Sequence, residues 1–154
     1  AYVLSDAEGT PDVILIASGS EVGLALEAQA ELTGKGIATR VVSMPSWELF
    51  DKQPQKYQDE VLPPNVTARL AIEMGIAQGW QKYTGSQGDI ISIEKFGASG
   101  PAKIVIEKYG FTIANVVKQA SKLVKAKPAP KSSKKPADSS ETVTAETAAS
   151  KTKK

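Results

Sequence analysis

The sequence predicts an α/β domain in three layers, with an open, mostly parallel sheet of about five strands flanked by helices, one strand being a candidate for antiparallel pairing. The run 13–17 is apolar at every position and ends at a Ser-Gly-Ser turn, after which apolar residues take helical spacing. A strand that is apolar on both sides is typical of a sheet covered on both faces. Strand-like and helical segments then alternate, which favours right-handed crossovers between parallel strands.

Prolines, glycines and the spacing of apolar residues predict the remaining elements. Residues 1–12 form a short extended segment and a turn, and residues 44–64, which are broken by prolines, predict one or two short helices on the surface. Further strands are predicted at 37–43, 67–73 and 89–94, and helices at 18–33, 78–83, 101–109 and from Thr112, which caps the last one.

The composition excludes several kinds of active site. The chain has 154 residues, 41% of them apolar, which suits one domain, and it has no histidine and no cysteine. Disulfides, thiolate nucleophiles and histidine-activated serines are therefore excluded, and a zinc or iron site is not expected. The acids Asp51, Asp59 and Glu60 lack the spacing of a calcium loop. We predict no metal site, and the lack of cysteine agrees with a cytoplasmic protein.

Charge divides the chain into two parts. Residues 1–124 carry 11 Lys and Arg against 14 Asp and Glu, whereas residues 125–154 carry 8 Lys against 3 acids. We expect 1–124 to be the globular domain and 125–154 to be a disordered tail rich in Lys, Pro, Ser, Thr and Ala. A solubilising role for the tail is favoured over recruitment of RNA, membrane or a partner protein. Nucleic-acid and membrane partners are not expected, and the start at Ala1 suggests a processed chain or a piece of a longer one.

Two turns are candidate anion sites. Ser18, Gly19 and Ser20 lie where a strand gives way to a helix, so backbone N–H groups there could receive a small anion. A capping box, in which Ser18 and Glu21 satisfy those N–H groups, is the favoured interpretation. Ser99 stands at a second such turn with lysines close in sequence, and there an N-cap is favoured.

An aromatic segment follows the second predicted strand. Trp47, Phe50 and Tyr57 alternate with charged residues, which favours a contact surface for another domain or subunit. Local core packing and a pocket remain as alternatives for these three side chains. Trp80 and Tyr83 are expected to pack in the domain itself.

Three separated blocks carry a resemblance to a known family. They are DVILIASGSEV at 12–22, SMPSWELF at 43–50, and FGASGPAK at 96–103 with EKYGFT at 107–112. In this order they resemble the C-terminal domain of a bacterial-type transketolase over about 2–124. One departure is Gly100, where the family usually has alanine.

The resemblance implies a three-domain, homodimeric transferase of the pentose phosphate pathway. Such an enzyme moves a two-carbon ketol unit between sugar phosphates with thiamine diphosphate and a divalent cation, Mg or Ca, and its catalytic and cofactor-binding groups belong to the two preceding domains. No catalytic or cofactor-binding residue is therefore carried over to this chain. We expect a structural or interface domain that is inactive alone; the alternative is a stand-alone small-anion-binding or regulatory module.

Overall fold

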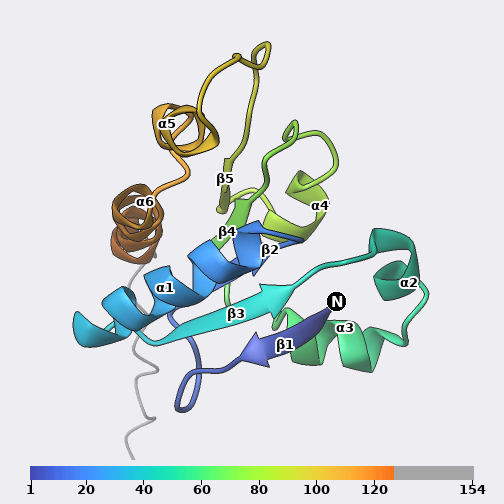
Figure 1. Cartoon of the computed structure of the whole chain (residues 1–154). Helices are drawn as coiled ribbons and strands as arrows, with labels where there is room; N and C mark the ends of the chain where they lie inside the picture. The colour runs from blue at the N-terminus through green and yellow to red at the C-terminus, as the bar shows by residue number, and fades with distance from the viewer. Residues whose placement is uncertain (127–154) are drawn as a thin grey trace, which may run out of the picture.

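The five strands form one sheet in the order β1-β3-β2-β4-β5 in the computed structural model of the chain, which describes residues 1–126 (Figure 1). Strands β2, β3, β4 and β5 are parallel, and β1 is an antiparallel edge strand on β3. This confirms the predicted mostly parallel sheet. The strands are β1 (Tyr2–Ser5), β2 (Val13–Ala17), β3 (Thr39–Ser43), β4 (Arg69–Ile72) and β5 (Asp89–Ile91).

Six helices complete the described part of the chain. They are α1 (Glu21–Gly34), α2 (Trp47–Asp51), α3 (Gln55–Val61), α4 (Gln81–Thr84), α5 (Ala102–Lys108) and α6 (Ile113–Ala126). Thr112 caps α6 as expected, since its hydroxyl accepts a hydrogen bond from the Asn115 N–H at 3.2 Å. Helix α6 includes Lys125 and Ala126, which the sequence assigns to the tail, and the rest of the predicted tail lies outside the described residues.

The sheet separates two apolar cores because successive side chains of a strand point to opposite faces. Val13, Leu15 and Ala17 of β2 pack with α1 and α6, whereas Ile14 and Ile16 pack with the layer formed by α2, α3 and α4. All five residues are fully buried. The apolar run of β2 is uninterrupted because both faces of this central strand are covered by helices.

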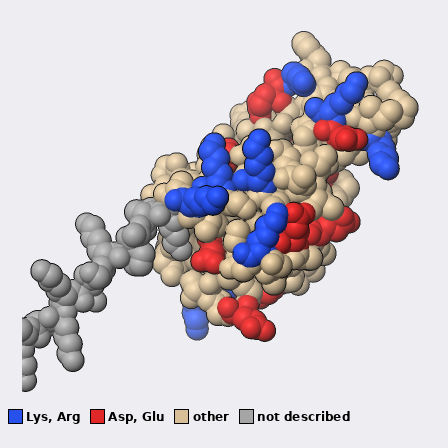
Figure 2. Space-filling view, turned by 90° about the vertical axis from the view of Figure 1, so that its left-hand side faces the viewer, with Lys and Arg blue, Asp and Glu red and all other residues tan. Residues whose placement is uncertain are grey.

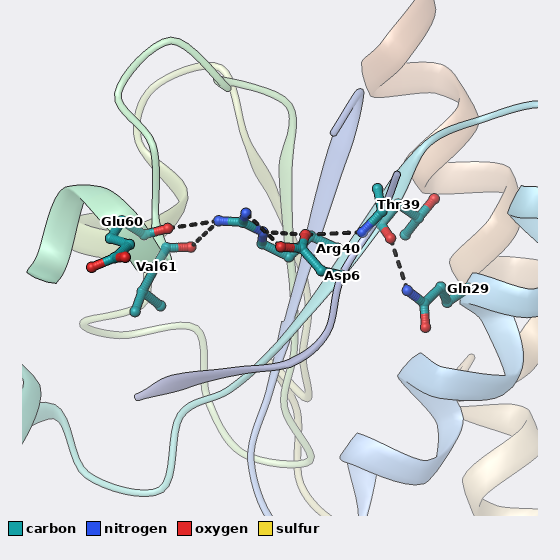
Figure 3. A network of polar contacts seen from close by, with 7 residues as sticks. Asp6, Gln29, Thr39, Arg40, Glu60 and Val61 are labelled. Atoms are coloured by element: carbon teal, nitrogen blue, oxygen red, sulfur yellow. Dashed lines mark hydrogen bonds and ion pairs between the residues drawn. The ribbon is translucent and has the colours of Figure 1, made fainter. Parts of the chain in front are cut away.

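An arginine ties the edge of the sheet to the second helical layer (Figure 3). Arg40 on β3 is 9% exposed, and its guanidinium donates to both carboxylate oxygens of Asp6 at 2.8 and 2.9 Å. Its Nη1 donates to the carbonyl oxygens of Glu60 and Val61 at 2.7 and 3.1 Å. The planar guanidinium satisfies these acceptors together, as an ammonium group would not.

The charged surface of the described part is mixed. On the face shown in Figure 2, Lys and Arg side chains lie among Asp and Glu side chains and extensive uncharged surface. None of the helices within residues 1–126 is both long and apolar enough to cross a bilayer.

We expect part of the stability of the domain to disappear in acid because of Asp6. The hydrogen bond from Arg40 holds the pKa of Asp6 below its usual value, against the opposing effect of burial. The contribution of this pair is present above the ordinary pKa of aspartate, about 4, and is lost as the pH falls through the lower pKa of the folded state. Asp6→Asn should lower the free energy of unfolding by about 1 kcal/mol or less near neutral pH, because the carboxylate is half exposed.

Urea unfolding near neutral pH and below about pH 3 measures this difference, which should vanish at the lower pH. The matched control is Glu8→Gln, at an exposed carboxylate of the same loop. Equal pH dependence in the Asp6→Asn variant and the parent chain would refute the assignment.

Gly88 is a second point on which the fold depends. A Cβ at this position would collide with the carbonyl oxygens of Thr84 and Arg69, which are backbone atoms that cannot move aside. Gly88→Ala should therefore lower the free energy of unfolding by more than about 2 kcal/mol. Gly23→Ala is the control, because that site in α1 is open and the change should stabilise the domain by up to about 1 kcal/mol. Denaturant unfolding of both variants measures the contrast, and equal stabilities would contradict it.

Candidate functional site

The candidate site lies at the carboxyl edge of the sheet, where the strand order reverses. The chain leaves β2 through α1 to reach β3 on one side, and it later reaches β4 on the other side of β2. Open α/β sheets commonly bind ligands at such a reversal. Ser18 follows β2 and Glu73 follows β4, and the Ser18 hydroxyl donates to Glu73 Oε2 at 3.0 Å. This bond joins two segments that are 55 residues apart.

A cavity of about 370 Å³ opens at this edge, a size within the range of small-molecule pockets. Its walls include Ser18, Met44, Trp47 and Ile76, and its acidic groups are Glu48 and Glu73. No lysine or arginine is present among the described residues that line it. The cavity therefore combines apolar walls with negative charge.

The capping box predicted for Ser18 and Glu21 is wrong. Helix α1 begins at Glu21, its N-cap is Ser20, and no side chain caps it. The Ser20 hydroxyl donates instead to Glu21 Oε1 at 2.7 Å, while the Ser18 hydroxyl is engaged by Glu73. The carboxylates of Glu21 and Glu73 thus lie beside the turn formed by Ser18, Gly19 and Ser20, and their charge opposes an anion there.

Of the three aromatic residues predicted to form a contact surface, Phe50 is buried within the chain, and Trp47 and Tyr57 are half-buried. Phe50 is 2% exposed and its ring centroid lies 6.1 Å from that of Tyr83. The contact-surface prediction is therefore wrong for Phe50, which local core packing explains. Trp47 is half-buried and meets Trp80 edge to face at 5.3 Å, and Tyr57 donates its hydroxyl to the Ala1 carbonyl at 2.9 Å.

The packing of Trp47 depends on a glycine. Gly79 has φ +91°, and a Cβ there would lie 2.6 Å from the indole ring of Trp47. Only glycine permits both this backbone conformation and this close approach. Trp80 and Tyr83 are buried, which confirms the packing role predicted for them.

A polar cluster lies beside the aromatic residues. Tyr83 donates its hydroxyl to Asp51 Oδ1 at 3.2 Å, and Lys82 pairs with Asp51 Oδ2 at 2.6 Å. Burial, followed by the charge and hydrogen bond of Asp51, raises the pKa of Tyr83 to about 12. Tyr83 therefore remains protonated at physiological pH and serves as a hydrogen-bond donor.

A half-buried arginine, Arg69, lies at the start of β4 and binds the second helical layer. Arg69 donates to four carbonyl oxygens, those of Val66, Tyr83, Leu62 and Pro63, at 2.8–3.0 Å. Burial lowers the pKa of Arg69, against the opposing charge of Asp59. Because all of these acceptors are backbone groups of the second layer, Arg69 has a structural part.

Ser99 lies in a separate cavity. The N-cap of α5 is Pro101 and no side chain caps this helix, so the predicted N-cap role of Ser99 is wrong. Ser99 is exposed and lines a cavity of about 340 Å³ together with Lys95, Ile104 and Tyr109. The structure therefore does not bring the two predicted anion turns together.

The described residues do not fit the cofactor that the family resemblance implies. Within residues 1–126, no group of three or more His, Cys, Asp or Glu side chains converges so as to hold a metal ion. The cavity beside Glu73 offers carboxylates where a diphosphate would need cations. No chemical step through thiamine diphosphate or a divalent cation is derived for this chain.

Sequence reasoning missed the acidic half of the site. Glu73 stands at the end of a predicted strand, and the carboxyl ends of parallel strands meet at one edge of the sheet. The sequence pattern could therefore have predicted that Glu73 lies near Ser18. Ile76 and Glu48 carried no such signal, because they lie in irregular or short helical segments whose course depends on packing.

Fold and site together define a doubly wound α/β domain with a serine–carboxylate bridge at the strand reversal. The family described as "Transketolase-like TK C-terminal domain" matches residues 1–112. Most of the chain is matched, and the chain belongs to this family.

Curated relatives agree with this assignment. The chain is 54% identical over 125 residues to a transketolase of Geobacillus stearothermophilus, covering 80% of this chain and 19% of the relative. It is 55% identical over 116 residues to a transketolase of Aquifex aeolicus, covering 75% of this chain and 17% of the relative. The chain thus spans about a fifth of the length of the relatives it matches.

Solved structures show the same fold. A transketolase from Leishmania mexicana has a TM-score of 0.74 at 38% identity, covering 80% of this chain and 18% of that one. A Pichia stipitis transketolase in complex with sedoheptulose 7-phosphate has a TM-score of 0.75 at 38% identity, covering 81% and 18%. A split-gene transketolase, an inactive β4 tetramer, shares the fold at a TM-score of 0.61 and 23% identity, covering 80% and 41%.

The tyrosine–aspartate contact leads to a titration prediction. Absorbance of the tyrosinate ion, recorded after rapid pH jumps, should show one of the four tyrosines ionising near pH 12. Asp51→Asn removes the negative charge and should move this pKa down toward the usual tyrosine range. Asp59→Asn serves as the control on the neighbouring helix α3. An unchanged titration in Asp51→Asn would show that Asp51 does not hold the hydroxyl.

Proposed function

We propose that this chain serves as the non-catalytic structural and interface domain of a transketolase. The observation that carries the proposal is that it aligns with only about a fifth of each relative, in a family of C-terminal domains. In the whole enzyme, a two-carbon ketol unit passes between sugar phosphates, and the preceding domains and a second subunit hold thiamine diphosphate and Mg or Ca. The localisation we propose is cytoplasmic.

The chemistry of the described residues supports this division of labour. The chain has no histidine or cysteine, and Tyr83 keeps its proton at physiological pH. The arginines Arg40 and Arg69 are occupied by structural acceptors and are not free to hold a sugar phosphate. The arginines are therefore unavailable for phosphate recognition, and we assign proton transfer to the preceding domains.

The alternative of a stand-alone anion-binding module is less well supported. The cavity beside Ser18 is lined by carboxylates, which repel anions, and Ser99 stands in an exposed loop. We therefore treat anion binding at Ser18, Gly19, Ser20 or Ser99 as the secondary hypothesis. For the lysine-rich residues 127–154, which lie outside the described part of the chain, we propose a solubilising role.

A fusion experiment tests the proposed function. The chain replaces the matched C-terminal region of the Geobacillus stearothermophilus transketolase, and two-carbon transfer is measured with a ketose phosphate donor, an aldose phosphate acceptor, thiamine diphosphate and Mg²⁺. The fused protein should transfer the ketol unit, whereas the chain alone should show no activity, because it lacks proton-transfer and cofactor-binding groups.

The fusion carrying Gly88→Ala is the matched control, and it should lose activity because the domain is destabilised. Transfer by the isolated chain, or an inactive fusion in which the domain is folded, would refute the proposal.

A further inference from the structure

We propose that the carboxyl edge of the sheet is the surface on which the preceding transketolase domains dock, and that these domains place a lysine or arginine side chain in the cavity beside Glu73. This inference rests on the proposed function and adds the surface and the chemistry of the contact. The surface, called here the acidic edge, consists of Trp47, Glu48, Leu49, Glu73 and Ile76.

The acidic edge exposes large apolar side chains that the chain itself does not cover. Leu49 is 64% exposed and Ile76 is 59% exposed. Ile76 lines the cavity together with Trp47, and Leu49 lies in α2 next to Glu48, another lining residue. Apolar side chains around a cavity are typical of a surface that is buried in an assembly.

Charge identifies the group that the cavity would receive. Glu48 and Glu73 are each held through one carboxylate oxygen, since Ser46 Oγ donates to Glu48 Oε2 at 3.1 Å and Ser18 Oγ donates to Glu73 Oε2 at 3.0 Å. Neither glutamate forms an ion pair within residues 1–126. Two oriented carboxylates with no basic residue among the described lining favour a cation.

The apolar walls favour a long side chain over a small ion. Met44 and Trp47 border the cavity, so the methylene groups of a lysine or arginine can pack on them while the charged end reaches the carboxylates. The indole of Trp47 adds a cation–π contribution to the same group. A basic residue of a protein partner therefore suits both halves of the cavity.

The course of the chain explains why the partner is the preceding part of the same polypeptide. Tyr2 pairs with Ser43, the last residue of β3, so the chain enters at the carboxyl edge of the parallel strands. Ala1 packs in the same apolar cluster as Trp47, and Figure 1 shows the N-terminus beside α2 and α3. A domain attached at this point arrives next to the acidic edge.

A second exposed surface competes with the acidic edge. Phe96 is 98% exposed and Ile104 on α5 is also exposed, and the cavity beside them is lined by Lys95 and Lys108. Its basic lining would suit an acidic partner. The acidic edge would bind a basic partner surface and the α5 surface an acidic one, so an experiment can distinguish the two.

Cysteine protection tests the location of the contact, because the chain has no cysteine of its own. Leu49→Cys and Ile76→Cys are placed on the acidic edge, and the exposed sites Thr10→Cys and Ser86→Cys are controls at the amino ends of strands. Each variant reacts with a maleimide as the isolated full chain and within the fused enzyme, whose host cysteines are replaced by serine.

We expect the rates at positions 49 and 76 to fall at least about tenfold on fusion, and the control rates to stay unchanged, because a buried interface excludes the reagent. Unchanged rates at 49 and 76 in an active fusion would overturn the inference while leaving the proposed function intact. Protection at Ile104→Cys without protection at 49 and 76 would overturn it in favour of the α5 surface. Concentration-dependent protection at 49 and 76 in the isolated chain would overturn it in favour of a second copy.

Neutral glutamine variants test the basic side chain. In the fused enzyme, Glu48→Gln with Glu73→Gln should raise the maleimide rate at Ile76→Cys about fivefold or more, because the docked cation loses its partners. Glu27→Gln, at an exposed glutamate of α1 on the other layer, is the matched control. An increase equal to that of the control, with the isolated domain equally stable in both variants, would rule out a basic residue in the cavity.

Discussion

The burial of β2 on both faces is the constraint from which the rest of this domain follows. Because Val13–Ala17 exposes nothing to water, helices must cover each side of the sheet, and the chain must cross from one side of β2 to the other. That crossing separates the segments after β2 and β4 at one edge. The cavity beside Ser18 and Glu73 is thus a consequence of how the strand is buried.

Two arginines join the sheet to the second helical layer, the one formed by α2, α3 and α4. Arg40 and Arg69 lie at the beginnings of β3 and β4 and direct their donors mainly to carbonyl groups of the second layer. Carbonyl groups at helix ends and in the segment after α3 would otherwise lack partners when buried, which costs free energy. Because the two guanidinium groups already bind these structural acceptors, they are not free to bind a phosphate ligand. This agrees with the proposed structural role of the domain.

The order and type of the elements could be predicted from the sequence because the signals are local. The run Val13–Ala17, the stripe of α6 and the cap at Thr112 each specify their element within a few residues. The roles of Ser18, Ser99 and Phe50 could not be predicted in the same way. Ser18 binds a carboxylate 55 residues away. Phe50 follows β3 and packs on Tyr83, which follows β4, and β2 lies between these two strands in the sheet.

The sequence by itself determined the layered α/β fold, the parallel sheet and the lack of histidine and cysteine chemistry, since periodicity and composition are properties of the chain alone. Only the tertiary structure decided that Glu73 engages Ser18, that the aromatic residues pack together, and that Leu49 and Ile76 stay exposed beside an acidic cavity. Contacts between distant segments depend on strand order and on competition among partners, and neither is encoded within a short stretch of residues.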